Sequence, residues 1–256
     1  MKRGHILLDG QDWEIIQHSK LPPGPEANKL PWKLPVTGTV IGVALNTTSI
    51  LASLEDQLDK APYKEAPKTP VLFIKTANTH VKSGQAVAIP LDQPSFAGPA
   101  LGVLIGKVAS KVREEDALEV IAGYTLVNEI SLEEKSFYRP DIKGKCRDTF
   151  CPIGTLITDT SSIADPSALT IDVSVNGVSQ QQYSTSELIY SIPQLIARIS
   201  TFMTLQPGDL LITGTPLKQV RLQNGDIISL HCKELGSLEN PVVAAINHET
   251  DAEIGQ

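Results

Sequence analysis

Apolar residues in this sequence gather in short runs, and long helical stripes are scarce. The runs at 40–45, 71–75 and 101–107 are almost continuously apolar, which predicts buried strands. Residues 169–175 instead alternate between apolar and polar side chains, and Asn176-Gly177 follows them. Alternation predicts a half-buried strand, and Asn-Gly is a strong signal for a two-residue hairpin turn. The pattern as a whole indicates a fold dominated by strands.

A helical period occurs in few segments. Residues 48–58 begin with Thr-Ser, which can cap a helix, and residues 114–123 begin with three acids and end in glycine. The capping-box pattern S-x-x-E opens a helix at 184–203, which Pro193 either kinks or restarts. Asn224-Gly225 predicts another hairpin, with the next strand returning beside it. The helix predicted at 184–203 should face the core with Leu195, Ile196, Ile199 and Phe202.

Prolines and turns suggest a boundary near Thr39. Residues 1–17 read as two strands around an Asp9-Gly10 turn, and residues 19–38 carry five prolines and little periodicity. The predicted organisation is a short hairpin and proline-rich linker (1–38), one domain (39–245) and a polar tail (246–256).

Composition excludes several classes of partner. The chain has 256 residues, a formal charge of −7 and a pI near 5.3, which argues against nucleic acid and anionic membranes. No apolar run approaches the roughly 18 residues of a membrane span, and the first residues lack the apolar stretch of a signal peptide. The three cysteines show no metal-binding spacing, which suits a reducing compartment. We therefore expect a cytoplasmic protein.

The chain concentrates its chemistry between Ile121 and Gly154. Asn128-Glu129 and an acidic pair at 133–134 are followed by cations at alternate positions and then by an acid: Lys143, Lys145, Arg147 and Asp148. An extended segment would place the three cations on one face, where they could hold the carboxylates or phosphates of a small anion. The alternative, a solvated charged strand or loop, stays open at this point.

Four motifs in order resemble the fumarylacetoacetate hydrolase family. They are GYTLVNEIS, GKCRDTFCPIG, FMTLQPGDLLITGTP and LENPVV, and the similarity covers roughly residues 39–243. SFYRP before KCRDTFCPIG is similar to one branch, the N-terminal halves or subunits of isomerase/decarboxylases of 4-hydroxyphenylacetate (homoprotocatechuate) degradation. The resemblance implies a β-rich α+β fold, a rolled mixed β structure with a few covering helices. It also implies a homodimer, or a heterodimer with a paralogous catalytic subunit.

The resemblance also assigns roles to residues. Glu129 and Lys145 would be catalytic, with Glu129 shuttling a proton and Lys145 holding an anion beside Lys75 or Arg147. A strand-end lysine such as Lys75 is otherwise usually solvated, and the threonines at 213 and 215 could simply shape a turn. The implied substrate-binding set is Lys75, Arg147, Asp148, Thr213 and Thr215.

The sequence departs from the family where a metal would bind. Relatives carry Glu-x-Glu and a third acid that hold Mg²⁺ or Mn²⁺, but Gly98 and Ala100 stand here, with Glu129 as the remaining acid. We therefore expect no tightly bound metal or other cofactor, and weak metal binding through Glu129 stays open. A His and Glu pair that acts on water or a proton in hydrolytic and decarboxylating relatives is likewise replaced, by Ile50 and Ser53.

Two functions follow from the resemblance. The first is isomerisation of 2-hydroxyhepta-2,4-diene-1,7-dioate, decarboxylation of 5-carboxymethyl-2-oxo-hex-3-ene-1,7-dioate, or both. The second is a metal-free scaffold without catalysis that dimerises with a metal-bearing paralogue. A hydrolase of acylpyruvates ranks third, because the metal acids and the His/Glu pair are both replaced.

Overall fold

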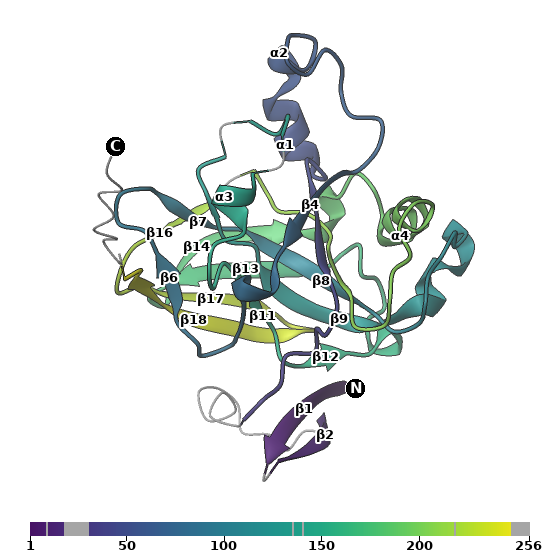
Figure 1. Ribbon diagram of the computed structural model, residues 1–256, viewed down its shortest axis with the longest axis vertical. Helices are drawn as coiled ribbons and strands as arrows, with labels where there is room; N and C mark the ends of the chain where they lie inside the picture. Colours follow the sequence, from purple (N-terminus) through teal and green to yellow (C-terminus); the bar gives the residue numbers. More distant parts are fainter. Residues whose placement is uncertain (9, 18–30, 135, 140, 218, 247–256) are drawn as a thin grey trace, which may run out of the picture.

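Strands dominate the computed structural model, which describes residues 1–8, 10–17, 31–134, 136–139, 141–217 and 219–246. Most of the predicted linker and nearly all of the predicted tail therefore lie outside the described residues. Within them the strands form three mixed or antiparallel sheets with short helices at their edges (Figure 1). This is the predicted β-rich α+β fold. No helix in the described part of the chain is long and apolar enough to cross a membrane.

The largest sheet has ten strands and supports the site described below. Its main path runs β2-β1-β12-β9-β8-β15-β3-β4, and β11 joins β9 to β5 beside that path. Its strands are β1 (Lys2–Leu8), β2 (Gln11–Gln17), β3 (Val40–Ala44), β4 (Val71–Lys75), β5 (His80–Lys82), β8 (Pro99–Ile105), β9 (Ile121–Asn128), β11 (Cys151–Ile153), β12 (Ile157–Thr158) and β15 (Leu210–Ile212).

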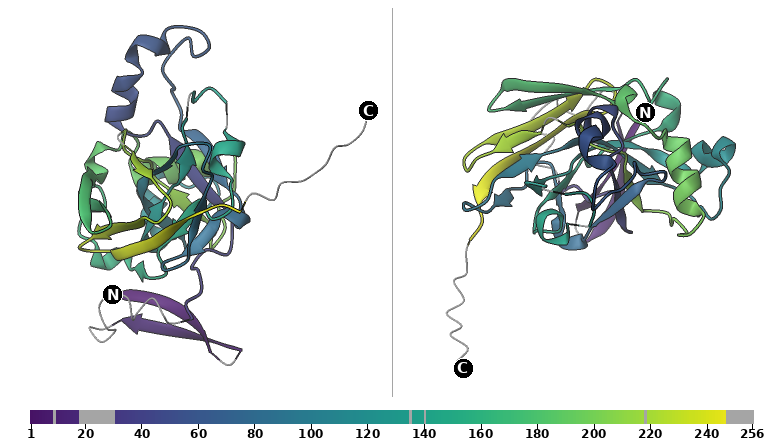
Figure 2. Two further views of the ribbon diagram at one scale, coloured as in Figure 1. Left: turned by 90° about the vertical axis from the view of Figure 1, so that its left-hand side faces the viewer. Right: turned by 90° about the horizontal axis from the view of Figure 1, so that it is seen from above.

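Two smaller sheets complete the roll, as the views in Figure 2 show. A five-stranded sheet follows the order β14-β13-β17-β18-β6, and a three-stranded sheet follows β10-β7-β16. The five strands are β6 (Val87–Ile89), β13 (Thr170–Val175), β14 (Val178–Ser184), β17 (Ile227–Cys232) and β18 (Gly236–Ala244). The three are β7 (Ser95–Ala97), β10 (Ser131–Leu132) and β16 (Val220–Leu222).

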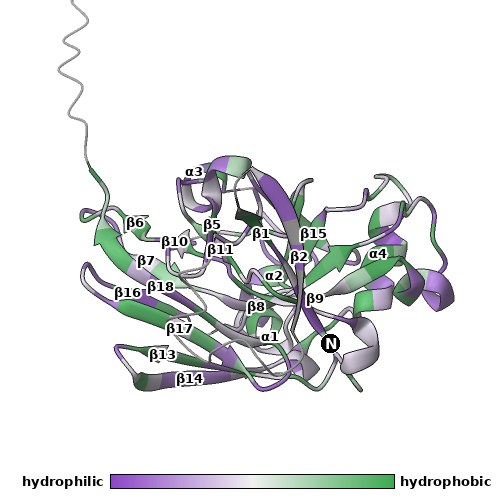
Figure 3. Cartoon of the chain, turned by 90° about the horizontal axis from the view of Figure 1, so that it is seen from below, coloured by the Kyte–Doolittle hydropathy of each residue, from purple (hydrophilic) through white to green (hydrophobic). Residues whose placement is uncertain are grey.

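The main core lies between the large and the five-stranded sheets. Buried side chains from β8, β9, β13 and β17 meet there with the apolar face of α4 (Ile192–Ser200). Figure 3 shows the contrast between apolar β17 and polar β14, the outer strand of its sheet. A second buried cluster includes Val40, Ala100, Val127 and Cys151. Burial of apolar area at roughly 25 cal/mol per Å² is the main force that closes these layers.

Helices are short and cover edges. The α-helices are α1 (Thr48–Ser53), α2 (Glu55–Leu58), α3 (Ile142–Lys145) and α4, and the 3₁₀ helices are η2 (Ala77–Thr79), η3 (Glu114–Val120), η4 (Thr160–Ser162) and η5 (Thr185–Glu187). The helix predicted for 48–58 breaks at Leu54, between α1 and α2. The one predicted for 114–123 ends at Val120, and Gly123 lies inside β9.

The start of α4 and two other predictions need correction. Ser191 and Gln194 form the capping box, with Pro193 in the first turn, whereas Ser184 caps only η5. Of the two alternatives for Pro193, a kink or a restart, the structure shows the restart. Phe202 is 71% exposed and is not part of the core stripe. The turn at Asn224-Gly225 does not close a hairpin of neighbours, because β16 pairs with β7 and β17 with β13 and β18.

Both other hairpins are present. β13 and β14 pair across Asn176-Gly177, whose φ angles of 52° and 76° fit a turn that needs left-handed backbone at both positions. β1 and β2 pair at the N-terminus, where Trp32 adds an antiparallel bridge to Ile6. Figure 2 shows this hairpin projecting from the body of the molecule on the side away from α1 and α2.

Candidate active site

Strand ends bring two lysines and a glutamate together inside the fold. Lys75 ends β4, and its neighbour in the register on β3 is Val40. Glu129 follows the last residue of β9, and its backbone N–H donates to the carbonyl of Gly98 at 2.8 Å. Lys145 ends α3 and points its ammonium at the same carboxylate. With Glu134 they form an alternating line of charges, called here the charged row: Lys75, Glu129, Lys145 and Glu134.

Lys75 is held almost entirely by the backbone. Its side chain is 0% exposed, and Nζ donates hydrogen bonds to the carbonyls of Ile130, Lys145 and Phe150 at 2.5, 2.7 and 3.1 Å. Three N–H groups thus meet three carbonyls, so the 2.6 Å approach of Nζ to Oε1 of Glu129 is an ion pair without a directed hydrogen bond. This lysine ties β4 to the last residue of α3 and to the segments before and after that helix.

Lys145 stands between two carboxylates. Its Nζ lies 3.3 Å from Oε2 of Glu129 and 3.1 Å from Oε2 of Glu134, and 4.6 Å above the ring of Phe73. Burial alone would lower the pKa of Lys145, but Glu129 and Glu134 outweigh it and the pKa is raised. The residue therefore carries a persistent positive charge.

The segment around Lys145 is not extended. Asp141 caps α3 by accepting a hydrogen bond from the backbone N–H of Gly144 at 2.9 Å, and this nucleates one helical turn. The alternating cations therefore do not share a face: Lys143 is exposed, Lys145 is buried and Arg147 is half-buried. The three-cation face, which required an extended segment, does not form, because the Asp141 cap turns residues 142–145 into a helix.

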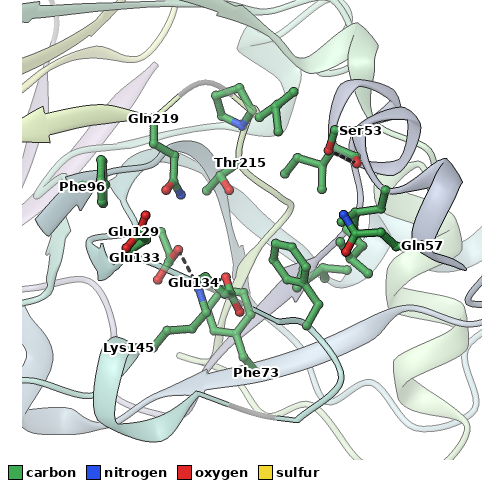
Figure 4. A pocket seen from close by; sticks show the side chains of 18 residues that line it. Ser53, Gln57, Phe73, Phe96, Glu129, Glu133, Glu134, Lys145, Thr215 and Gln219 are labelled. Atoms are coloured by element: carbon green, nitrogen blue, oxygen red, sulfur yellow. Dashed lines mark hydrogen bonds and ion pairs between the residues drawn. The ribbon is translucent and has the colours of Figure 1, made fainter. Parts of the chain in front are cut away.

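A cavity of about 410 Å³ opens beside the charged row. Its charged walls are Glu129, Glu133, Glu134 and Lys145, the last being the one basic residue that lines it in the described part of the chain. Figure 4 shows the glutamates and Lys145 on one side and Ser53 and Gln57 of the α1–α2 region on the other. Apolar walls come from Ile50, Leu54, Phe73, Phe96, Phe137 and neighbouring residues.

The predicted substrate-binding residues separate in space. Thr215 lines the cavity, whereas Thr213 is fully buried and donates its hydroxyl to the carbonyl of Leu101 at 3.2 Å. Asp148 accepts a hydrogen bond from Asn78 at 2.6 Å on the exposed side. Neither Asp148 nor Arg147 lines the cavity, and Lys75 lies behind Glu129 rather than on the wall.

Glu134 is a candidate that the sequence argument passed over as part of an acidic patch. Its side chain is 13% exposed and lines the cavity. Burial raises the pKa of Glu134, while Lys145 acts in the opposite direction. No local sequence pattern singles Glu134 out, because Lys145 comes near it only through the turn of α3, which the cation spacing did not predict.

Among the described residues, the cavity walls do not form a cage for a divalent cation. Both oxygens of Glu129 face ammonium groups, and positions 98 and 100, which the register places across from Glu129 and Val127, offer no side-chain oxygen. A Cβ added at Gly98 would lie 2.6 Å from the Glu129 carbonyl oxygen. In the described residues, no three His, Cys, Asp or Glu side chains gather as metal ligands would. Ile50 and Ser53 line the cavity without an acid–base group.

The chain is similar to known proteins both in sequence and in fold. The chain is 43% identical over 206 residues to the 4-hydroxyphenylacetate degradation bifunctional isomerase/decarboxylase of Escherichia coli, which covers 80% of this chain and 47% of that protein. Its fold matches 5-carboxymethyl-2-hydroxymuconate delta-isomerase from Mycobacterium smegmatis with a TM-score of 0.78 and 27% identity, over 96% of this chain and 100% of that one.

A second similar structure contains a metal. Maleylpyruvate hydrolase from Sphingobium sp. SYK-6, solved with manganese(II) and pyruvate, matches with a TM-score of 0.71 and 25% identity, over 86% of this chain and 76% of that one. The chain spans about half the length of the first curated relatives it matches, at 47% of each. The sequence profile described as fumarylacetoacetate (FAA) hydrolase C-terminal matches residues 39–243. The chain therefore belongs to the fumarylacetoacetate hydrolase family.

Proposed function

We propose that this chain is an isomerase that converts the enol form of an unsaturated 2-hydroxy dicarboxylate into its keto form. The observation that carries the proposal is the ammonium of Lys145, buried on the cavity wall and kept charged by two carboxylates. Tautomerisation passes through a dienolate, and a fixed cation in a site of low dielectric stabilises the negative charge that develops on its oxygen.

The relatives favour a particular class of substrate. One is named an isomerase/decarboxylase of aromatic-acid degradation, and another similar structure is named a 2-hydroxyhepta-2,4-diene-1,7-dioate isomerase, with a TM-score of 0.76. We take 2-hydroxyhepta-2,4-diene-1,7-dioate as the substrate to test first. Decarboxylation of 5-carboxymethyl-2-oxo-hex-3-ene-1,7-dioate belongs to the same proposal, because losing CO₂ also leaves an enolate that a cation must hold.

The proposal assigns roles within the cavity. Lys145 holds the enolate oxygen, Thr215 donates a hydrogen bond to a substrate carboxylate, and Glu129 keeps Lys145 charged and in place. We propose that residues 39–245 form the functional domain. In this proposal the chain acts in the cytoplasm, as a dimer with a second copy or with a paralogous chain. No step in this scheme uses a metal, because the described side chains offer no suitable set of ligands.

The first experiment uses the purified chain treated with a chelator. Loss of the ultraviolet absorbance of the dienol reports turnover, measured with and without added Mg²⁺ or Mn²⁺ and compared with a Glu129→Gln variant. We expect turnover without metal that falls in the variant, since Lys145 loses one of its two partners. Turnover that depends on added metal would overturn the metal-free scheme.

A scaffold without catalysis is the second candidate, and one observation favours it. Gly98 and Ala100 stand where the family resemblance implies metal-binding acids, so this chain could serve a metal-bearing partner instead. The same assay separates the two candidates. No turnover by the chain alone under any metal condition, restored by adding a paralogous subunit, would support the scaffold and reject the isomerase.

A further inference from the structure

We infer that Glu134 is the group that carries the proton in the isomerisation, an inference that rests on the proposed function. The residue reaches the cavity from the loop after β10, next to the ammonium that would hold the enolate oxygen. A proton acceptor and an anion-stabilising cation that stand 3.1 Å apart can act on neighbouring atoms of one substrate.

The two buried glutamates of the charged row differ in how their oxygens are engaged. Glu129 has an ammonium at each oxygen, Lys75 at 2.6 Å and Lys145 at 3.3 Å, and is 1% exposed. Glu134 contacts Lys145 through Oε2 alone, and in the described part of the chain no other cation contacts it. Each oxygen of Glu129 is already engaged by an ammonium group, so Glu129 suits positioning, whereas Glu134 has Oε1 left to meet a substrate and suits proton transfer.

The surroundings of Glu134 also favour a role in proton transfer. Lys145 faces it from α3, Glu129 faces it from the end of β9, Asp141 lies at the N-cap of α3, and Glu133 precedes it in the loop. Burial raises the pKa of Glu134, Glu129 and Asp141 add to the increase, and Lys145 opposes it. A carboxyl with a raised pKa is a stronger base near neutral pH than an ordinary one.

Glu134 alone can complete the proton transfer of the isomerisation. The carboxylate of Glu134 takes the proton of the 2-hydroxyl group, the O–H bond breaks, and the dienolate oxygen faces Lys145. The protonated Glu134 then gives that proton to a carbon of the dienolate. A C–H bond forms from the π electrons of the diene, the C=O bond forms at carbon 2, and Glu134 returns to its carboxylate. No oxidant, reductant or co-reactant is needed.

The kinetic test compares two neighbouring substitutions in the same cavity. Glu134→Gln keeps the size of the side chain but cannot carry the proton, so we expect kcat to fall by about 10²- to 10⁴-fold with a small change in KM. Glu133→Gln removes the same charge from the next residue, and we expect it to change KM and to keep the acidic limb of the kcat profile against pH. Normal kcat in Glu134→Gln would overturn the inference.

A binding measurement checks the inference without turnover. Heptanedioate, a saturated dicarboxylate of the same length, is titrated calorimetrically at about pH 6 in two buffers that differ in ionisation enthalpy. A dianion beside Glu134 disfavours its charged form, so we expect proton uptake on binding that is lost in Glu134→Gln and retained in Glu133→Gln. Uptake that persists in Glu134→Gln would also overturn the inference.

The outcomes distinguish the two proposals. Absence of turnover in the wild-type chain, with proton uptake that depends on Glu134, would overturn the proposed reaction and leave Glu134 as the titrating group of the site. Turnover in the wild-type chain that survives in Glu134→Gln would overturn the inference and leave the proposed reaction standing. Urea unfolding of each variant shows whether a loss reflects chemistry or folding.

Discussion

The two ends of the charged row have the same chemistry and different surroundings. At the inner end Lys75 meets Glu129 at 2.6 Å, and at the outer end Lys145 meets Glu134 at 3.1 Å. The inner lysine gives its three N–H groups to backbone carbonyls, whereas the outer lysine lies against a cavity and the ring of Phe73. The number of backbone groups that a buried charge satisfies therefore separates a residue that holds the fold from one that is free to meet a ligand.

Removing the inner cation should have the largest effect on stability. In Lys75→Met the carboxylate of Glu129 keeps one cation in a buried site, and the carbonyls of Ile130 and Phe150 lose a hydrogen bond each. Removing one partner of a buried ion pair typically costs about 3–5 kcal/mol. Urea unfolding followed by circular dichroism measures the loss.

The control for this change is Lys68→Met. Lys68 pairs with Glu65 at the surface, where the lysine side chain is 77% exposed, so its removal should leave the urea midpoint nearly unchanged. A Lys75→Met protein as stable as Lys68→Met would show that the inner end does not hold the fold. The comparison between the two ends would then fail.

Removing the outer cation should affect turnover more than folding. Lys145→Met takes away the charge that would stabilise the dienolate, and losing one such group typically lowers kcat by about 10²- to 10³-fold. The methionine can still pack against Phe73, and Glu134 can regain water from the cavity. Steady-state kinetics and urea unfolding of the same preparation give both quantities. A stability loss as large as that of Lys75→Met would make the two ends equivalent.

The sequence predicts an element well when the residues that determine it lie close together in the chain. β4 is predicted at its observed bounds, and the β13–β14 turn at its observed residues, because apolar runs and Asn-Gly act within a few residues. The Ser184 capping box failed because another box, at Ser191, competes seven residues later with Pro193 in place. The capping pattern alone does not show which of two nearby serines begins the helix.

The residues of the candidate site were grouped before the structure was known, but their arrangement was not. Glu129 and Lys145 do lie together, and Lys75 joins them, but this grouping came from family resemblance. The contact between Lys145 and Glu134 depends on the cap at Asp141 that turns residues 142–145 into a helix, which the cation spacing does not encode. Thr213 and Asp148 also lie outside the cavity because partners distant in sequence, Leu101 and Asn78, hold them.

The smallest effect we expect is a difference in how stability depends on pH. The pKa of Glu134 is raised above its ordinary value of 4.5 in the folded chain. At pH values between 4.5 and the raised pKa, Glu134 is therefore protonated in a larger fraction of folded than of unfolded molecules. The free energy of unfolding should therefore fall as pH rises from 4.5 through the raised pKa, and Glu134→Gln should lack this contribution. Urea midpoints at a series of pH values, taken as the difference between wild type and variant, isolate it. Lys145→Met sharpens the test: without the cation that lowers the pKa of Glu134, the fall should extend to higher pH. A difference that rises with pH would mean that Lys145 outweighs burial and holds Glu134 in its charged form.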